Sequence, residues 1–191
     1  MKSRINQRRF LNKAEPPHIA TLILLGGASA LATNLFLPSL PSMAKWFQTD
    51  YATMQLSVAI YLAFSAVIQL FIGPMADKWG RRPILLWGIA IFCGASLGCV
   101  LAPNVQVFLL FRMLQSAIAV AMVLSRAIVR DLYPQEQAAS KLAYVVMGIS
   151  VVPMAAPAIG GLLDQYLGWH ASFWLLLAIG LLIWVLTWFD L

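Results

Sequence analysis

The chain has 191 residues, of which 61% are hydrophobic and only 10% are charged, with a formal net charge of +6. A water-soluble domain is about 45–50% apolar and about a quarter charged, so this chain has too little polar surface to cover a globular fold in water. The composition excludes a cytosolic enzyme, a nucleic-acid-binding domain and a disordered protein. It indicates an integral membrane protein in contact with membrane lipid.

Six continuous apolar stretches follow a basic N-terminal tail at residues 1–18. Each is close to the roughly 20 apolar residues that a helix needs to cross a hydrocarbon core about 30 Å thick. The runs are continuous rather than alternating, which is typical of helices and not of barrel strands. We therefore expect an all-α integral membrane fold with six transmembrane helices at residues 19–37, 52–72, 83–101, 105–129, 142–163 and 171–189.

The basic residues are distributed unevenly between the two sides of these spans. Eleven of the 13 Lys and Arg residues lie in the tail, after the second span, or at and beyond the end of the fourth span, whereas the opposite side has only Lys45. Arg112 lies inside a span. Because basic residues accumulate in cytoplasmic loops, both ends of this six-helix segment are expected in the cytoplasm.

The second and fifth spans end in a similar pattern on opposite membrane faces. One ends in Gly73-x-x-x-Asp77-x-x-Gly80 and the other in Gly160-x-x-x-Asp164-x-x-x-Gly168. These spans are the middle members of two successive helix triplets, so the echo predicts a 3+3 inverted repeat.

Catalytic motifs are missing from the sequence. It contains no Ser–His–Asp set, no metal-ligand cluster and no phosphate-binding loop, and the loops between spans are too short for a catalytic domain. We expect that the chain is not an enzyme and that it binds no metal and no cofactor.

The most specific stretch, GPMADKWGRRP at residues 73–83, joins the second and third spans. Its glycines permit a sharp turn and close helix approach. Asp77 lies at the C-terminal end of a helix, where the dipole is unfavourable to an acid, so it needs nearby cations. The alternative interpretation is a basic loop with an isolated acid. The candidate residues here are Gly73, Asp77, Gly80, Arg81 and Arg82.

This stretch resembles the loop signature of the major facilitator superfamily, G-x-L-a-D-r-x-G-r-k, with Met75 in the leucine position. Residues 112–115 are similar to the R-x-x-q-G motif of the fourth helix, and residues 153–161 resemble the antiporter motif G-P-x-x-G-G. Residues 125–133 and 35–41 are similar to bicyclomycin- and chloramphenicol-resistance exporters.

The resemblance implies a twelve-helix transporter of which this chain is the N-terminal six-helix half, a small-molecule substrate bound between two halves, and a bacterial inner membrane. It implies proton-coupled efflux of small, largely apolar drugs by alternating access, with the proton as coupling ion and the absent C-terminal half as partner. Two alternatives stay open: a metabolite symporter or uniporter of the same superfamily, and a non-transporting half-size membrane protein. The chain is then either a fragment or a natural half-size product.

Arg112 lies about 12 Å inside the fourth predicted span at 1.5 Å per residue. A central Arg costs at least about 2.5–3.5 kcal/mol on insertion scales, so it is expected to face a water-filled cavity or a polar partner. The alternative is an Arg that extends to the outer headgroups. The substrate or proton pathway is expected to include the polar positions Asn34, Tyr61, Gln69, Arg112 and Gln115.

The acids Asp77 and Asp131 and the cation Arg81 are expected to form a cluster at the cytoplasmic ends of the second and fourth helices, with Arg130 beside them. The resemblance implies that this cluster closes the inner side of the cavity. The alternative is a static, solvated group of charges.

In the fifth span, Pro153 and Pro157 each remove a backbone hydrogen bond, and Gly160 and Gly161 extend a small-residue surface that allows close packing. The resemblance associates this helix with antiport. One departure matters: the exporters usually carry Asp in the first helix where this chain has Asn34, which cannot titrate.

Overall fold

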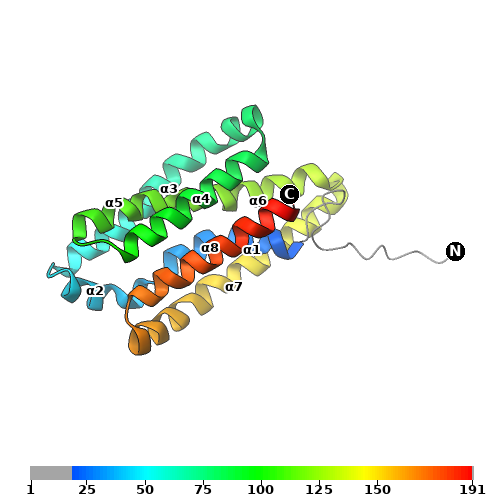
Figure 1. Cartoon of the computed structure of the whole chain (residues 1–191). Helices are drawn as coiled ribbons and strands as arrows, with labels where there is room; N and C mark the ends of the chain where they lie inside the picture. The colour runs from blue at the N-terminus through cyan, green and yellow to red at the C-terminus, as the bar shows by residue number, and fades with distance from the viewer. Residues whose placement is uncertain (1–18, 191) are drawn as a thin grey trace.

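The computed structural model describes residues 19–190, and every regular element in this part of the chain is helical (Figure 1). The tail expected at residues 1–18 lies outside the described residues. The elements in chain order are α1 (Ile19–Asn34), η1 (Leu37–Ser39), α2 (Leu40–Trp46), α3 (Tyr51–Trp79), α4 (Arg81–Val100), α5 (Val105–Gln115), η2 (Ser116–Ile118), α6 (Ala119–Leu132), α7 (Gln135–Leu167) and α8 (His170–Asp190).

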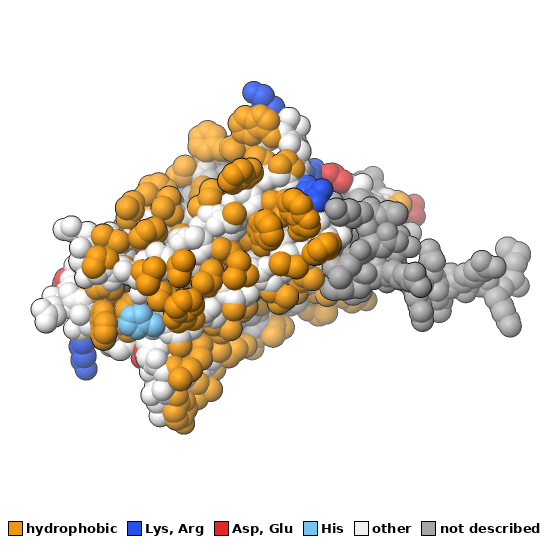
Figure 2. Space-filling view, in the orientation of Figure 1, with side chains coloured by type: hydrophobic (Ala, Val, Ile, Leu, Met, Phe, Trp, Pro, Cys, Tyr) orange, Lys and Arg blue, Asp and Glu red, His pale blue; other side chains and the backbone are white. Residues whose placement is uncertain are grey.

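Six helical segments of the described chain are long and apolar enough to cross a membrane, which confirms the predicted number of spans. The start of α1 and the end of α8 lie at the same end of the bundle (Figure 1). We call this the basic end, because six of the described Lys and Arg residues lie in or near the helix ends that meet there, on α3, α4, α6 and α7. Hydrophobic side chains cover the face of α4 and α8 in Figure 2.

Two spans begin at side-chain caps. Asp50 accepts a hydrogen bond from the Thr53 backbone N–H at 3.3 Å, and Asn104 accepts one from Val107 N–H at 2.9 Å. Each cap satisfies an N–H group that the first helical turn leaves without a partner. The Thr53 hydroxyl also donates to Asp50 and lowers the pKa of this carboxyl.

The stretch between the second and third predicted spans, residues 73–82, is helical except at Gly80. Helix α3 continues past Pro74 to Trp79, and α4 begins at Arg81, so Gly80 alone makes the turn, with φ of +88°. Helix α7 likewise extends beyond its predicted limits and ends before Gly168, where φ is +78°. A positive φ is readily accessible to glycine, and this explains the terminal glycine of each echoed motif.

The first and fourth spans are interrupted, which the sequence periodicity did not predict. The first continues after α1 through η1 and the short helix α2, both with proline in the first turn. In the fourth, the 3₁₀ turn η2 separates α5 from α6, and it follows directly after Gln115. A 3₁₀ stretch inside a helix marks local strain or a functional hinge.

The spans differ in how much of each is buried. More than half of the most apolar window, 56%, is buried in the first and fourth spans, against 22% in α3 and 17% in α7. The first and fourth spans therefore form the centre of the bundle, and α3 and α7 present largely unpartnered apolar faces.

Close packing of α1 on α7 depends on small residues at positions 148, 156 and 160, which lie on one face of α7. Gly148 lies against Ile23, and Ala156 is completely buried. At Gly160 a Cβ atom would overlap the carbonyl oxygen of Leu35, whereas at Gly161 the nearest atom would be Pro38 Cβ at 3.8 Å. Positions four apart share one helix face, so this stripe lets the two backbones approach.

We predict that Gly160→Ala lowers the stability of the protein by about 1–3 kcal/mol, because the new methyl group must displace backbone rather than a flexible side chain. Gly94→Ala is the matched control, since no atom lies within 4 Å of the added Cβ. It should be neutral or stabilising by about 0.5–1 kcal/mol. Thermal unfolding of detergent-purified protein, followed by circular dichroism, measures both, and equal midpoints would contradict the packing account.

Candidate functional site

Arg112 lies in the centre of the bundle and is completely buried. Both terminal nitrogens donate to the carbonyl oxygen of Ala32 at 3.3 Å, and Nη1 also donates to Gln115 Oε1. The Gln115 amide donates to Ser96 Oγ at 2.7 Å, and Ser96 donates to the carbonyl of Phe92 at 2.8 Å. A continuous hydrogen-bonded chain therefore runs from α1 through α5 to α4.

Three aromatic rings surround the guanidinium of Arg112. Its Cζ atom lies 4.1 Å from the ring centroid of Phe36, 4.6 Å from that of Tyr61 and 6.0 Å from that of Phe173. Cation–π contacts reach about 2 kcal/mol when the pair is desolvated. Tyr61 is fixed in turn by its hydroxyl, which donates to the carbonyl of Ser29 at 3.2 Å.

No described carboxylate pairs with Arg112; the acids whose side chains are described lie at helix ends, as expected from the sequence. A buried charge without a counter-ion is costly unless hydrogen bonds replace its hydration. Here a carbonyl, an amide oxygen and three ring faces provide that replacement, although Nε has no described partner. Arg112 therefore faces polar partners inside the bundle. The residues of this cluster come from α1, the segment after α1, α3, α4, α5 and α8.

The other predicted pathway residues lie outside this cluster. The Asn34 side-chain amide donates to the carbonyl of Ala30 at 2.7 Å within α1. Gln69 is exposed on α3. The five predicted residues thus divide into a buried group, Tyr61, Arg112 and Gln115, and two separate positions.

A second cluster of charges lies at the basic end, around a cavity of about 440 Å³ between α3, α6 and α7. Of the predicted gate residues, the cavity is lined by Gly73, Asp77, Arg81 and Arg130. Arg126 also lines it and was not among the predicted site residues, although its four-residue spacing from Arg130 was a readable signal for a shared face.

Arg81 pairs with Asp131 at 2.5 Å, which joins the start of α4 to the end of α6. The expected acid–base–acid cluster is incomplete, because Asp77 forms no ion pair with any described residue. Asp77 lies in the last turn of α3, before the Gly80 turn, and it lines the same cavity as Arg81. The pair is partly exposed, with side chains 26% and 54% accessible, so its contribution to stability is small.

The side chain of Arg82 does not join the other predicted gate residues. Its Nη2 donates to the carbonyl of Trp188 at 3.0 Å, and its Cζ lies 5.3 Å from the Trp188 ring centroid. Successive residues on a helix are about 100° apart, so adjacent arginines point to different neighbours. Arg81 therefore contacts α6, and Arg82 contacts α8.

At the opposite end, Asp164 of α7 accepts hydrogen bonds from Ser42 of α2 at 2.8 and 3.0 Å. Asp164 is the counterpart of Asp77 in the sequence echo. Helix α7 remains continuous through Pro153 and Pro157. Among residues 19–190, no group of three or more potential ligands is positioned for a metal ion.

We predict that Gln115→Leu destabilises the protein by about 1.5–3 kcal/mol, because it removes a hydrogen bond to a buried charge. Gln106→Leu on the exposed first turn of the same helix, α5, is the control and should change stability by less than about 0.5 kcal/mol. Denaturation of the purified protein followed by tryptophan fluorescence compares the two. Equal effects would show that the Arg112 network is not a stabilising centre.

The chain matches known transport proteins over most of its length. The family model of the Major Facilitator Superfamily matches residues 22–191. A chloramphenicol resistance protein of Pseudomonas aeruginosa is 38% identical over 160 residues, which are 81% of this chain and 38% of the relative. Multidrug resistance protein D of Escherichia coli is 35% identical over 159 residues, covering 83% of this chain and 40% of the relative.

A bicyclomycin resistance protein homolog of Haemophilus influenzae is 30% identical over 172 residues, covering 90% of this chain and 43% of the relative. The chain therefore spans about two fifths of the length of these relatives. With six membrane-length helices and a match across nearly all of them, the chain is a multi-pass membrane protein and not an enzyme, and it belongs to the Major Facilitator Superfamily.

Proposed function

We propose that this six-helix unit is the N-terminal half of a proton-coupled exporter of small, largely apolar drugs in a bacterial inner membrane. The observation that carries the proposal is the match across the whole bundle to proteins named for chloramphenicol, bicyclomycin and multidrug resistance. The concentration of Lys and Arg at the basic end supports a cytoplasmic location for both ends of the unit, because basic residues accumulate on the cytoplasmic side.

A second six-helix half is the proposed partner. The apolar faces of α3 and α7 are the least buried of the six spans and suit a further layer of helices. The substrate would bind between the halves. Alternating access would then be a rocking of one half against the other.

The role proposed for Arg112 is to keep the bundle rigid as that rocking occurs. Its hydrogen bonds and ring contacts connect most of the spans, so movement within the half would break several of them at once. Asn34 and Gln69, which lie outside this cluster, are the proposed positions for contact with substrate or protons in this half.

The proposed inner gate consists of Asp77, Arg81, Arg130 and Asp131 around the basic-end cavity. Asp77, which has no described ion-pair partner, is free to engage a group on the second half when the inner side closes. Each such contact biases two states by a few kcal/mol at most. Gly73 supports this role, because a Cβ added there would have no neighbouring atom within 4 Å, which leaves room for a second half.

The α7 segment that contains Pro153, Pro157, Gly160 and Gly161 is proposed to support antiport. Its close packing against α1 would prevent leakage through the part of the bundle opposite the basic end. Proton coupling itself requires a titratable group. No acid with a described side chain lies deep in the membrane, so the deep acid is proposed to lie in the second half.

We predict that the chain joined to its C-terminal half lowers the accumulation of labelled chloramphenicol in cells lacking other exporters, and that Asp77→Asn reduces this export at least about tenfold. Asp50→Asn is the matched control: it also removes one carboxylate, but Asn caps a helix as well as Asp does. Export by the control should equal wild type.

A protonophore should abolish export if protons drive it. Export that resists the protonophore would favour a uniporter and contradict the proposed coupling. Export by Asp77→Asn at the wild-type rate, at equal expression, would contradict the proposed gate.

A further inference from the structure

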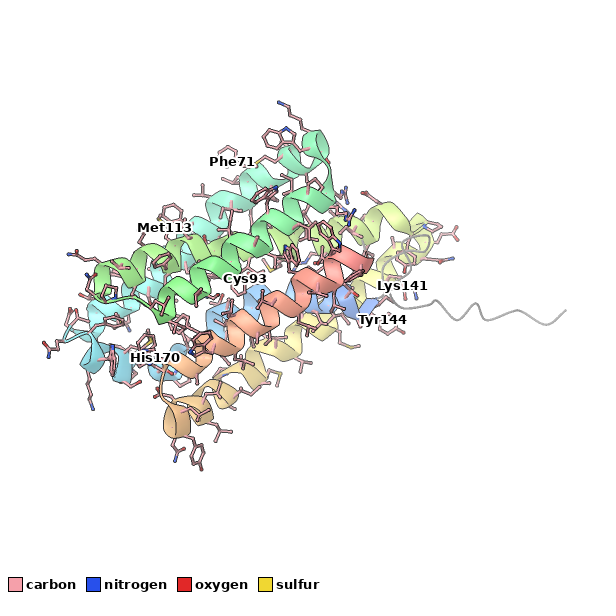
Figure 3. All side chains as sticks on the ribbon, viewed as in Figure 1. Phe71, Cys93, Met113, Lys141, Tyr144 and His170 are labelled. Carbon is pink, nitrogen blue, oxygen red and sulfur yellow. The ribbon has the colours of Figure 1, made fainter. Side chains whose placement is uncertain are left out.

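A groove follows the seam between α4 and α8. Its first part, of about 280 Å³, begins at the basic end between Pro83, Trp87, Trp184 and Trp188. A second part of about 290 Å³ shares Ala90 and Trp184 with the first and continues to Cys93 and Leu181. Figure 3 shows Cys93 over this seam.

The groove is apolar along its length and charged at one end. Arg82 immediately precedes Pro83 and lies over the Trp188 ring at 5.3 Å. Its Nη2 donates one hydrogen bond, to the Trp188 carbonyl at 3.0 Å. A guanidinium carries five N–H donors, so terminal N–H groups of Arg82 are left for an acceptor outside the described chain.

The dimensions correspond to one leaflet of a membrane. From Arg82 to Cys93 is eleven residues of α4, or about 16 Å, which is about half of a hydrocarbon core about 30 Å thick. The charged end lies where headgroups are found, because Arg82 is in the first turn of the α4 span and Trp188 is in the last turn of the α8 span. The tryptophans also mark this level, since the amphipathic indole ring favours the membrane interface.

We propose that the α4–α8 groove binds a phospholipid, with the phosphate at Arg82 and one acyl chain along the apolar seam. Arginine pairs with phosphate through charge-assisted hydrogen bonds, and the apolar floor excludes a soluble anion as the whole ligand. Stacked Trp184 and Trp188, with ring centroids 5.6 Å apart, form the wall beside the first part of the acyl chain. This site is separate from the proposed gate and does not depend on the proposed function.

The test is native mass spectrometry of the full chain in detergent, titrated with phosphatidylglycerol. Wild-type protein should retain one lipid more tightly than the rest. Arg82→Gln should weaken this first binding step about fivefold, the scale of one basic residue near an anionic surface. Lys78→Gln is the matched control: it removes the same charge at the same end of the bundle, but Lys78 lies over Trp79 on α3. It should leave the first step unchanged.

Two further experiments test the phosphate and the acyl chain of the ligand separately. Diacylglycerol, which lacks phosphate, should bind to wild type about as weakly as phosphatidylglycerol binds to Arg82→Gln. Ala90→Phe should fill the groove and weaken binding while Arg82 is intact. A melting midpoint within a few degrees of wild type verifies folding of each variant.

Three results would overturn the proposal. Equal weakening by Arg82→Gln and Lys78→Gln would indicate general electrostatic attraction only. Inorganic phosphate that displaces the lipid fully at equal concentration would indicate a soluble-anion site. Unchanged lipid retention in Ala90→Phe would show that the acyl chain does not lie along the α4–α8 seam.

Discussion

The burial of Arg112 constrains the rest of this bundle. A guanidinium in the centre of a membrane protein must replace its hydration, and here it does so with the Ala32 carbonyl, the Gln115 amide and the faces of three aromatic rings. These groups come from different spans. The requirement to satisfy one charge therefore determines how the spans pack around the first and fourth, which are the most buried.

Small residues provide the second constraint, because lipid offers no hydrophobic force that would press helices together. Close approach of α1 and α7 requires that Gly160 lack a side chain next to the Leu35 carbonyl. Turns at Gly80 and Gly168 reduce the connections after α3 and α7 to one or a few residues. The result is a compact unit whose largest unpartnered apolar surfaces are on α3 and α7, where a second half is proposed.

The spans were predictable because a bilayer imposes a length on any apolar helix, and length is visible in sequence. Their ends were less predictable: Asp77, Lys78 and Trp79 are polar or interfacial in character yet continue α3, since a helix can extend into the headgroup region without losing hydrogen bonds. The break at η2 was not visible, because Ser116–Ile118 has no proline or glycine. Its position follows from packing around the buried Arg112 and Gln115.

The site was predictable only in its local part. Gln115 was recognisable as a partner for Arg112 from its spacing of three residues, but Ser96, Phe36 and Phe173 are distant in sequence and carry no signal of their own. The adjacent Arg81 and Arg82 were assigned one role as a pair, whereas the helix directs them to α6 and α8. Pairing across helices depends on tertiary geometry, which one sequence does not display.

The central claim is that Arg112 and its partners form a dry interior rather than part of a water-filled pathway. It can be tested by thiol labelling in protein whose Cys93 and Cys99 are replaced by alanine. A cysteine at position 96, introduced as Ser96→Cys, replaces one atom inside the network, and Gln106→Cys on the exposed turn of α5 is the reference. The account predicts rapid labelling of Gln106→Cys by a water-soluble reagent and no labelling of Ser96→Cys until the protein unfolds. Equal labelling rates at the two positions in the folded protein would contradict it.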